Sequence, residues 1–222
     1  MAPSQSQIAS THVETLNLPN PPHGRPQILV NESISEGMAI LASAHAGVAW
    51  FLSSGDSERS AISFKPSDCL RLTPEKLAEC RRTDPYLSLT ESALNNIEVA
   101  LVGGAGTDAR PTFSRGRDQR DCNLRMYILV RGDVNLSEAM AASANAAIGC
   151  FARYAHQPEV QDWAHFSFRK VICRVTEVEL QRAMKAESYV AVGNELSSSP
   201  VALAFSPRSE WPKMFRFLSL YR

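Results

Sequence analysis

The hydrophobic and polar positions of this chain follow the same series of patterns twice. Each series opens on a short apolar run, at 27–31 and at 125–131, which predicts a strand. Apolar residues at helical spacing come next and predict amphipathic helices over 35–52 and 137–154. The buried stripes are expected to be Ile40, Ala44, Val48 and Phe51 in the first helix, and Met140, Ala144, Ile148 and Phe151 in the second.

The residues themselves also repeat, in the same order and at offsets of 100 to 103 positions. The matching segments are 28–30 with 128–130, 42–48 with 142–148, 71–73 with 174–176, and 99–101 with 201–203. Four ordered matches with so little drift indicate an internal duplication.

Further strands and helices alternate in both halves. In the first half the pattern predicts a strand near 68–72, a helix over 74–82 and a strand over 97–102. In the second half it predicts a helix near 158–165, a strand over 170–175, a helix over 177–187 capped by Thr176, strands over 189–193 and 201–205, a short helix from Ser209 and a last apolar stretch over 215–221. This alternation favours the α/β class, as a three-layer α/β/α architecture with a mixed sheet.

The chain divides into four segments. Residues 1–25 are polar and proline-rich, and we expect a flexible arm there. The first unit, 26–104, is shortened, because a Gly-Gly-Ala-Gly run at 103–106 breaks the chain where a closing helix is expected. A Gly/Arg-rich linker over 105–123 leads to the second unit, 124–222. We therefore expect two tandem units that form a pseudo-dimer.

Composition excludes few functions. Lysine plus arginine equals aspartate plus glutamate, so no overall field favours nucleic acid or an anionic membrane. The five scattered cysteines lack the close pairs of zinc or dithiol sites, which favours buried free thiols in a reducing, cytoplasmic compartment. No apolar run reaches membrane-spanning length, no histidine–carboxylate cluster has metal-ligand spacing, and we expect neither a metal nor a cofactor.

Three segments of the second half carry a family resemblance. They are the apolar run that ends Val130-Arg131-Gly132-Asp133-Val134, the small-residue helix over 142–147, and the stretch from 201 to Leu218-Ser219-Leu220-Tyr221. Their order resembles the peptidyl-tRNA hydrolases of archaea and eukaryotes and their bacterial relatives, over nearly all of 124–222. The first half resembles the family mainly over 27–51, where His45 stands at the position of the family's histidine. The resemblance implies an α/β fold and hydrolysis of peptidyl-tRNA esters.

The residues that the family uses for catalysis differ here. The family places a lysine, in a Gly-Lys pair, at the start of its first helix. Gly37-Met38 occupies that place in the first half and Ser137-Glu138 in the second. The nearest counterpart of the family's Gln-Asp pair is Asn194-Glu195. The resemblance therefore implies the fold without the lysine-dependent reaction.

Three residues are candidates for catalysis. His45 is a candidate general base, because imidazole titrates near neutral pH, although a hydrogen-bonded structural histidine is the alternative. Asp133 and Glu195 follow predicted strands at the edge where open α/β sheets bind ligands, or they are solvated loop acids.

Other side chains are candidates for binding alone. Asn145, Arg131 and Asn194 are candidates for binding a ligand. The segment after the glycine run is basic, and either contacts phosphates or is only a linker; its arginines are Arg110, Arg115, Arg117 and Arg120.

The hypothesis that follows is a peptidyl-tRNA-hydrolase-like protein without the family lysine, which binds a small molecule or a protein partner or runs an altered hydrolase or transferase reaction. One alternative is an active hydrolase of peptidyl- or aminoacyl-tRNA esters that uses His45 or Glu195. The other is a non-catalytic structural module. Binding of tRNA has weak support, no membrane partner is expected, and the oligomeric state is open.

Overall fold

The computed structural model describes residues 26–53, 63–83, 87–91, 98–102, 123–193 and 199–222. The expected arm over 1–25 and nearly all of the linker over 105–123 lie outside these ranges. In the first half the elements are β1 (Gln27–Asn31), α1 (Glu36–Ser53), the 3-10 helix η2 (Pro66–Asp68), β2 (Cys69–Leu72), α3 (Pro74–Thr83), β3 (Leu87–Glu91) and β4 (Glu98–Val102).

The second half is longer in its described part. Its elements are β5 (Arg125–Arg131), α4 (Leu136–Tyr154), α5 (Pro158–Asp162), the π-helical turn η3 (Trp163–Ser167), β6 (Arg169–Val175), α6 (Glu177–Ala186), β7 (Val190–Gly193), β8 (Pro200–Arg208), the 3-10 helix η4 (Lys213–Phe217) and β9 (Ser219–Leu220). The α/β class expected from the sequence is confirmed.

The strands form two separate mixed sheets with the same local order. The first sheet runs β2-β1-β4-β3, and the second runs β7-β8-β5-β6-β9. In each sheet the first strand along the chain has one parallel and one antiparallel neighbour. Strand β1 is parallel to β2 and antiparallel to β4, and β5 is parallel to β6 and antiparallel to β8. The two-residue strand β9 on β6 belongs to the second sheet alone.

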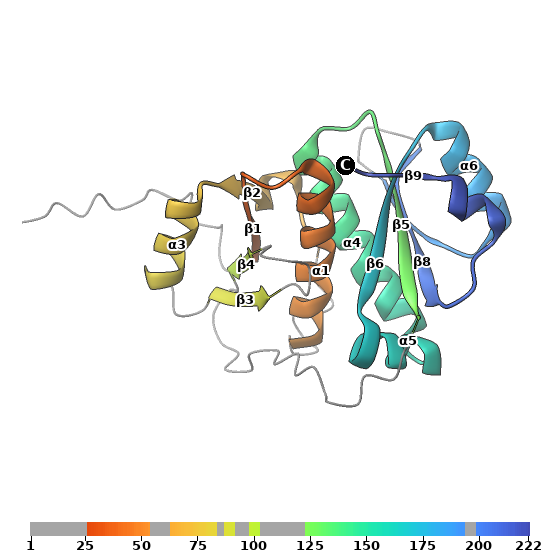
Figure 1. Cartoon of the computed structure of the whole chain (residues 1–222), viewed down its shortest axis with the longest axis horizontal. Helices are drawn as coiled ribbons and strands as arrows, with labels where there is room; N and C mark the ends of the chain where they lie inside the picture. The colour runs from red at the N-terminus through yellow and green to blue at the C-terminus, as the bar shows by residue number, and fades with distance from the viewer. Residues whose placement is uncertain (1–25, 54–62, 84–86, 92–97, 103–122, 194–198) are drawn as a thin grey trace, which may run out of the picture.

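Helices α1 and α4 lie side by side between the two sheets, as Figure 1 shows, with α3 on the far side of the first sheet and α6 on the far side of the second. The alternation of strand side chains explains this order of layers. Ile28 and Ile128 face the helix pair, whereas Leu29 and Leu129 face outward. The expected α/β/α layers are therefore present around each sheet, but the middle helix layer is common to both.

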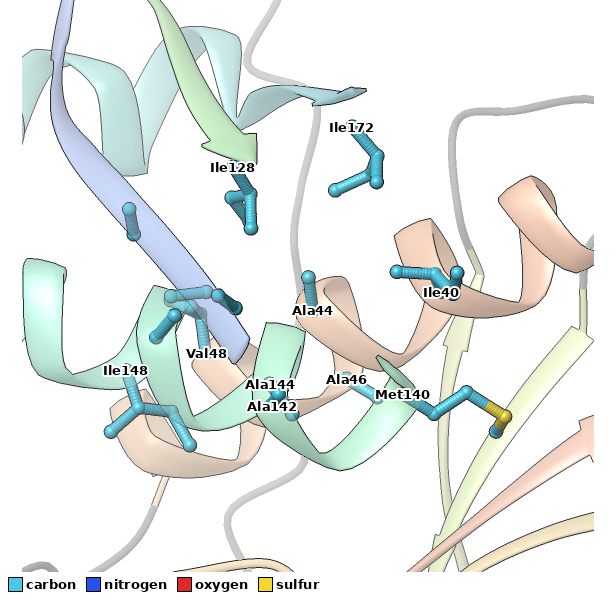
Figure 2. Packing of buried hydrophobic residues seen from close by; sticks show 14 of the residues in the cluster. Ile40, Ala44, Ala46, Val48, Ile128, Met140, Ala142, Ala144, Ile148 and Ile172 are labelled. Atoms are coloured by element: carbon cyan, nitrogen blue, oxygen red, sulfur yellow. The ribbon is translucent and has the colours of Figure 1, made fainter. Parts of the chain in front are cut away.

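Small residues let the two central helices approach closely. A Cβ atom on Gly47 would lie 3.1 Å from the Cβ of Ala144 and 3.2 Å from Cδ1 of Ile148. Figure 2 shows Ala44, Ala46, Ala142 and Ala144 in this contact, with Ile128 and Ile172 of the second sheet above it. These residues belong to one continuous core, because inner-face side chains of both sheets contact the same helix pair.

The outer faces of the sheets carry smaller cores. Leu29 packs with Leu77 and Cys80 of α3 on the first sheet. On the second sheet Tyr127 lies 4.4 Å from Trp211 and 5.3 Å from Phe215, measured between ring centroids. The four cysteines of the described part are buried free thiols: Cys69, Cys80, Cys150 and Cys173. Burial raises the pKa of Cys69, Cys150 and Cys173 to about 12, so these thiols are unreactive at neutral pH.

Several local predictions are confirmed by the chain's own capping chemistry. The side chain of Thr176 accepts a hydrogen bond from the Glu179 amide and the Glu179 carboxylate accepts one from the Thr176 amide, which starts α6 where predicted. Asn135 accepts from the Glu138 amide at 2.9 Å and starts α4.

Other local predictions are wrong, incomplete or missing. No helix begins at Ser209; the nearest helical turn is η4, and Pro212 precedes it. The helix expected near 158–165 changes to π-helical geometry at Trp163 and ends at Phe168, which has a left-handed φ of 49°. Strand β3 was not foreseen, because its Leu-Ser-Leu-Thr-Glu sequence is short.

Because both halves share one core, we expect a cavity in that core to lower the free energy of unfolding strongly. Phe151 is 6% exposed and its ring lies edge-on to that of Phe51, with centroids 6.0 Å apart. We expect Phe151→Ala to lower the free energy of unfolding by about 3–5 kcal/mol, as truncated core aromatics do. Urea denaturation followed by circular dichroism measures this.

The matched control is Phe217→Ala. Phe217 is 85% exposed, so its truncation should change stability by less than about 0.5 kcal/mol. A small effect of Phe151→Ala, comparable to that of the control, would mean that α4 is not packed as described.

Candidate functional site

Polar side chains gather at the carboxyl end of β5, around Arg131. Its guanidinium donates two hydrogen bonds to Asp133, from Nε to Oδ1 at 2.9 Å and from Nη2 to Oδ2 at 2.5 Å. The carboxylate of Glu177 lies 3.9 Å from Nη2 of Arg131. This edge of the sheet is where ligands bind in open α/β proteins. The structure thus brings together two predicted site residues, Arg131 and Asp133.

The fork-like geometry of this pair shifts the pKa values of both side chains. The hydrogen bonds to Arg131 hold the pKa of Asp133 below its ordinary value, and those to Asp133 raise the pKa of Arg131. The negative charges of Glu177 and Glu138 raise the pKa of Arg131 further. The carboxylates of Asp133 and Glu177 lie 2.5 and 3.9 Å from Nη2 of Arg131, and Glu138 adds a third negative charge that acts on this guanidinium. We call Arg131, Asp133, Glu138 and Glu177 the carboxylate edge.

The neighbouring loop is held by arginine and serine side chains. Nη2 of Arg174 donates to the main-chain oxygen of Gly132 at 2.7 Å, and its guanidinium lies over the Tyr221 ring. Ser199 donates to Oε1 of Glu177 at 2.6 Å. These bonds keep the end of β5 and the start of α6 in a fixed arrangement.

The starts of the two central helices differ. At α1 the main chain of Tyr221 covers Gly37 so closely that a Cβ there would lie 1.9 Å from the Tyr221 oxygen. The half-buried side chain of Met38 packs against the shared core. At α4 the corresponding residues are Ser137 and Glu138, both half-buried.

Asn145 holds the two halves together. Its side-chain amide accepts a hydrogen bond from the Phe64 amide and donates one to the Phe64 carbonyl, both at 2.8 Å. Its predicted role was ligand binding. In this structure both ends of the amide are already engaged by a main-chain segment of the first half.

His45, at the matching place on α1, lies against the second half. Its ring meets that of Phe168 edge-on, with centroids 4.9 Å apart. Its Nδ1 is buried and has no hydrogen-bond partner within the described residues. Burial lowers the pKa of His45 well below its ordinary value, the positive charge of Lys170 lowers it further, and the Leu41 carbonyl opposes the shift.

Lys170 is a notable residue that sequence reasoning missed. It is 8% exposed, and its Nζ lies 3.4 Å from the ring centroid of Phe168 and 4.7 Å from that of Trp163. Burial lowers its pKa well below the ordinary lysine value, whereas the two rings favour the charged form. Little in the sequence indicates this burial, because a lysine at the start of an apolar strand usually lies in solvent.

The remaining predicted residues cannot be placed. Asn194, Glu195 and the arginines Arg110, Arg115, Arg117 and Arg120 lie outside the described residues. Within the described ranges, His, Cys, Asp and Glu side chains form no group of three that could hold a metal ion. None of the helices in those ranges combines the length and the apolar character needed to cross a bilayer.

Comparison with known proteins does not place the chain in a family. No protein-family model matches it, and no curated protein matches it. The functional argument therefore rests on the residues and their geometry.

The buried His45 predicts a pH-dependent stability. Because its pKa is lowered in the folded chain, the unfolded chain binds a proton more readily, and stability falls as the pH drops below the ordinary value of 6.5. We expect His45→Asn to remove this contribution, which is at most about 1.4 kcal/mol per pH unit. Urea denaturation between about pH 7 and pH 5 measures the slope.

The exposed His156 supplies the matched control. His156→Asn should keep the wild-type slope of stability against pH. If His45→Asn also keeps the wild-type slope of stability against pH, His45 is not buried in the neutral form.

Proposed function

We propose that this chain is a fused pair of peptidyl-tRNA-hydrolase-like units that has lost ester hydrolysis and binds a ligand or protein partner at the carboxylate edge. The observation that carries the proposal is the Arg131–Asp133 pair with Glu138 and Glu177 around it. The pairing of the two halves, the missing cation and the charge of the edge support it.

Equivalent contacts made in opposite directions support the pairing. His45 on α1 touches Phe168 of the second half, and Asn145 on α4 binds Phe64 of the first. Such reciprocity is what a two-fold interface between identical subunits produces. Phe51 and Phe151 contact each other, as equivalent residues near a two-fold axis do.

Equivalent arginine contacts in the two sheets give a second, independent likeness between the halves. Arg71 donates to the main-chain oxygens of Glu32 and Ile34, and Arg174 donates to that of Gly132. Arg71 lies on β2 opposite Val30 of β1, and Arg174 lies on β6 opposite Val130 of β5, so the two arginines occupy equivalent positions in their sheets. An ancestral two-fold dimer whose subunits became joined in one chain accounts for both parallels.

The missing cation argues against the family's reaction. A fixed positive charge beside the scissile ester stabilises the developing oxyanion, and one such donor is worth several kcal/mol of barrier. Met38 packs against the core and carries no charge, and Gly37 beside it is covered by Tyr221. At α4, Glu138 would repel the same oxyanion.

The charge of the edge favours a basic ligand. Arg131 already forms a two-point pair with Asp133, so it is a poor receptor for phosphate. Glu177 and Glu138 add negative charge, and this arrangement attracts an amine or a basic peptide segment while repelling the tRNA backbone.

The first experiment compares hydrolysis of peptidyl-tRNA by the purified chain with that by buffer. We expect equal rates and weak tRNA binding with a shallow dependence on salt. Hydrolysis above the buffer rate that is lost in His45→Ala or Glu195→Gln would instead establish the alternative of an active hydrolase.

A second experiment tests the binding edge. Spermidine and a lysine-rich peptide should raise the melting temperature and bind in calorimetry, whereas inorganic phosphate should not. Asp133→Asn with Glu177→Gln should weaken this binding at least about tenfold, a loss of about 1.4 kcal/mol.

The control variant is Glu159→Gln, an exposed change on α5, which Figure 1 shows at the opposite end of the second sheet. It should bind both basic probes as the wild type does. Tighter binding of phosphate than of spermidine would contradict the proposal.

A further inference from the structure

The buried lysine at the other end of the second sheet has no place in the carboxylate edge. Lys170 is the second residue of β6, five residues before the end of that strand at Val175. At about 3.3 Å per residue it lies roughly 16 Å from the edge. Its Nζ donates a long hydrogen bond of 3.4 Å to the Phe168 carbonyl, and no carboxylate pairs with it in the described part of the chain.

Aromatic rings enclose this amine. Trp163 and Phe168 stack at 28° with centroids 4.9 Å apart, and Nζ of Lys170 lies close to both rings. Trp163 is fully buried and its indole nitrogen donates to the Arg169 carbonyl at 2.8 Å. The side chains around the amine are therefore apolar.

The segment that encloses the amine has unusual backbone geometry. Residues 163–167 form a π-helical turn, a form that occurs often at functional sites. Phe168 follows with φ of 49°, the one positive value at a non-glycine residue in the described ranges. A bulky aromatic residue in this region is strained, and such strain persists where the surrounding structure holds it.

A second basic group with an unsatisfied nitrogen adjoins the same ring. His45 meets Phe168 edge-on, and its buried Nδ1 lacks a partner among the described residues. Buried polar atoms without partners are rare in native structures and recur at catalytic sites. Nζ of Lys170 lies 3.4 Å from the centroid of the same ring, so both basic groups adjoin Phe168.

We propose that Lys170 is a reactive amine that forms an imine with a small uncharged aldehyde or ketone, with His45 as the proton acceptor beside it. Uncharged carbonyl compounds suit this site because the rings of Trp163 and Phe168 lie against the amine. The inference is independent of the proposed function, which concerns the opposite end of the sheet.

The reaction is balanced without any other reagent. The lone pair of the neutral Nζ forms a bond to the carbonyl carbon, and the carbonyl π pair moves to oxygen, which gains a proton as Nζ loses one. His45 takes the second proton from Nζ and passes it to the hydroxyl group, which leaves as water while the nitrogen lone pair forms the C=N bond, so amine plus aldehyde yields imine plus water. A lysine desolvated among apolar side chains is activated for this chemistry because burial favours its neutral form.

The chain offers an internal comparison for the test. It contains five lysines, of which Lys65, Lys76, Lys185 and Lys213 are exposed. The folded full-length chain is treated at about pH 7 with propionaldehyde and cyanoborohydride, which reduces any imine to a stable propyl-lysine. Peptide mass spectrometry then gives the rate at each lysine.

We expect Lys170 to be modified at least about tenfold faster than any of the four exposed lysines, since each unit by which a pKa falls gives tenfold more neutral amine. The preference should vanish in concentrated urea, where all five lysines are in water. His45→Asn should slow modification at Lys170 and change its pH profile without affecting the other four.

Modification of Lys170 at or below the rate of the exposed lysines would overturn the proposal, because the amine would then be either held as an ammonium ion by the two rings or out of reach. An unchanged rate and pH profile at Lys170 in His45→Asn would overturn the role of His45. Both outcomes are read from chains that need no variant of Lys170, so a failure of Lys170→Met to fold would not affect the test.

Discussion

The close contact of α1 with α4 is the constraint on which the other layers depend. Each sheet buries one face on this helix pair, and Gly47 and Ala144 leave no space between the helices for a larger side chain. Because Ile28 of the first sheet and Ile128 of the second face the same pair, the helices form one core for both halves. Close approach maximises dispersion contacts at a buried surface, so the spacing sets the stability of the whole molecule.

On our proposal of a fused pair, the joining of two units in one chain would also let them diverge. In a symmetric dimer one substitution changes both copies of a site, whereas in a joined chain each copy changes alone. Asn145 binds the Phe64 backbone, whereas His45, at the matching position, meets the Phe168 ring edge-on. On our proposals the second half kept a charged edge for binding, and the contact between the halves acquired a buried amine.

Much of the fold could be predicted from the sequence, because periodicity reports burial directly. The apolar runs at 27–31 and 125–131 form strands, and the stripes behind them form the central helices. The capping box at Thr176 placed α6 to within a residue. The repeat allowed for two similar sheets, but the single helix layer that both sheets cover could not be predicted, since periodicity shows that a face is buried without showing what covers it.

The candidate site was predictable only where chemistry is local. Arg131 and Asp133 are two residues apart and form a pair in the structure. The enclosure of Lys170 depends on a π-helical turn and on α1 of the other half, and no spacing in the sequence indicates either. Its position at the start of a strand resembled that of a solvated lysine.

Native-state hydrogen exchange on Ile148→Ala tests the shared core most directly. Ile148 lies on α4, is 6% exposed, and Leu29 and Leu129 are central in β1 and β5 of the two sheets. If both halves depend on one core, the opening free energies of the Leu29 and Leu129 amides fall by the same amount, about 2–5 kcal/mol. A fall at Leu129 with unchanged protection at Leu29 would show that the halves open independently and would contradict the account.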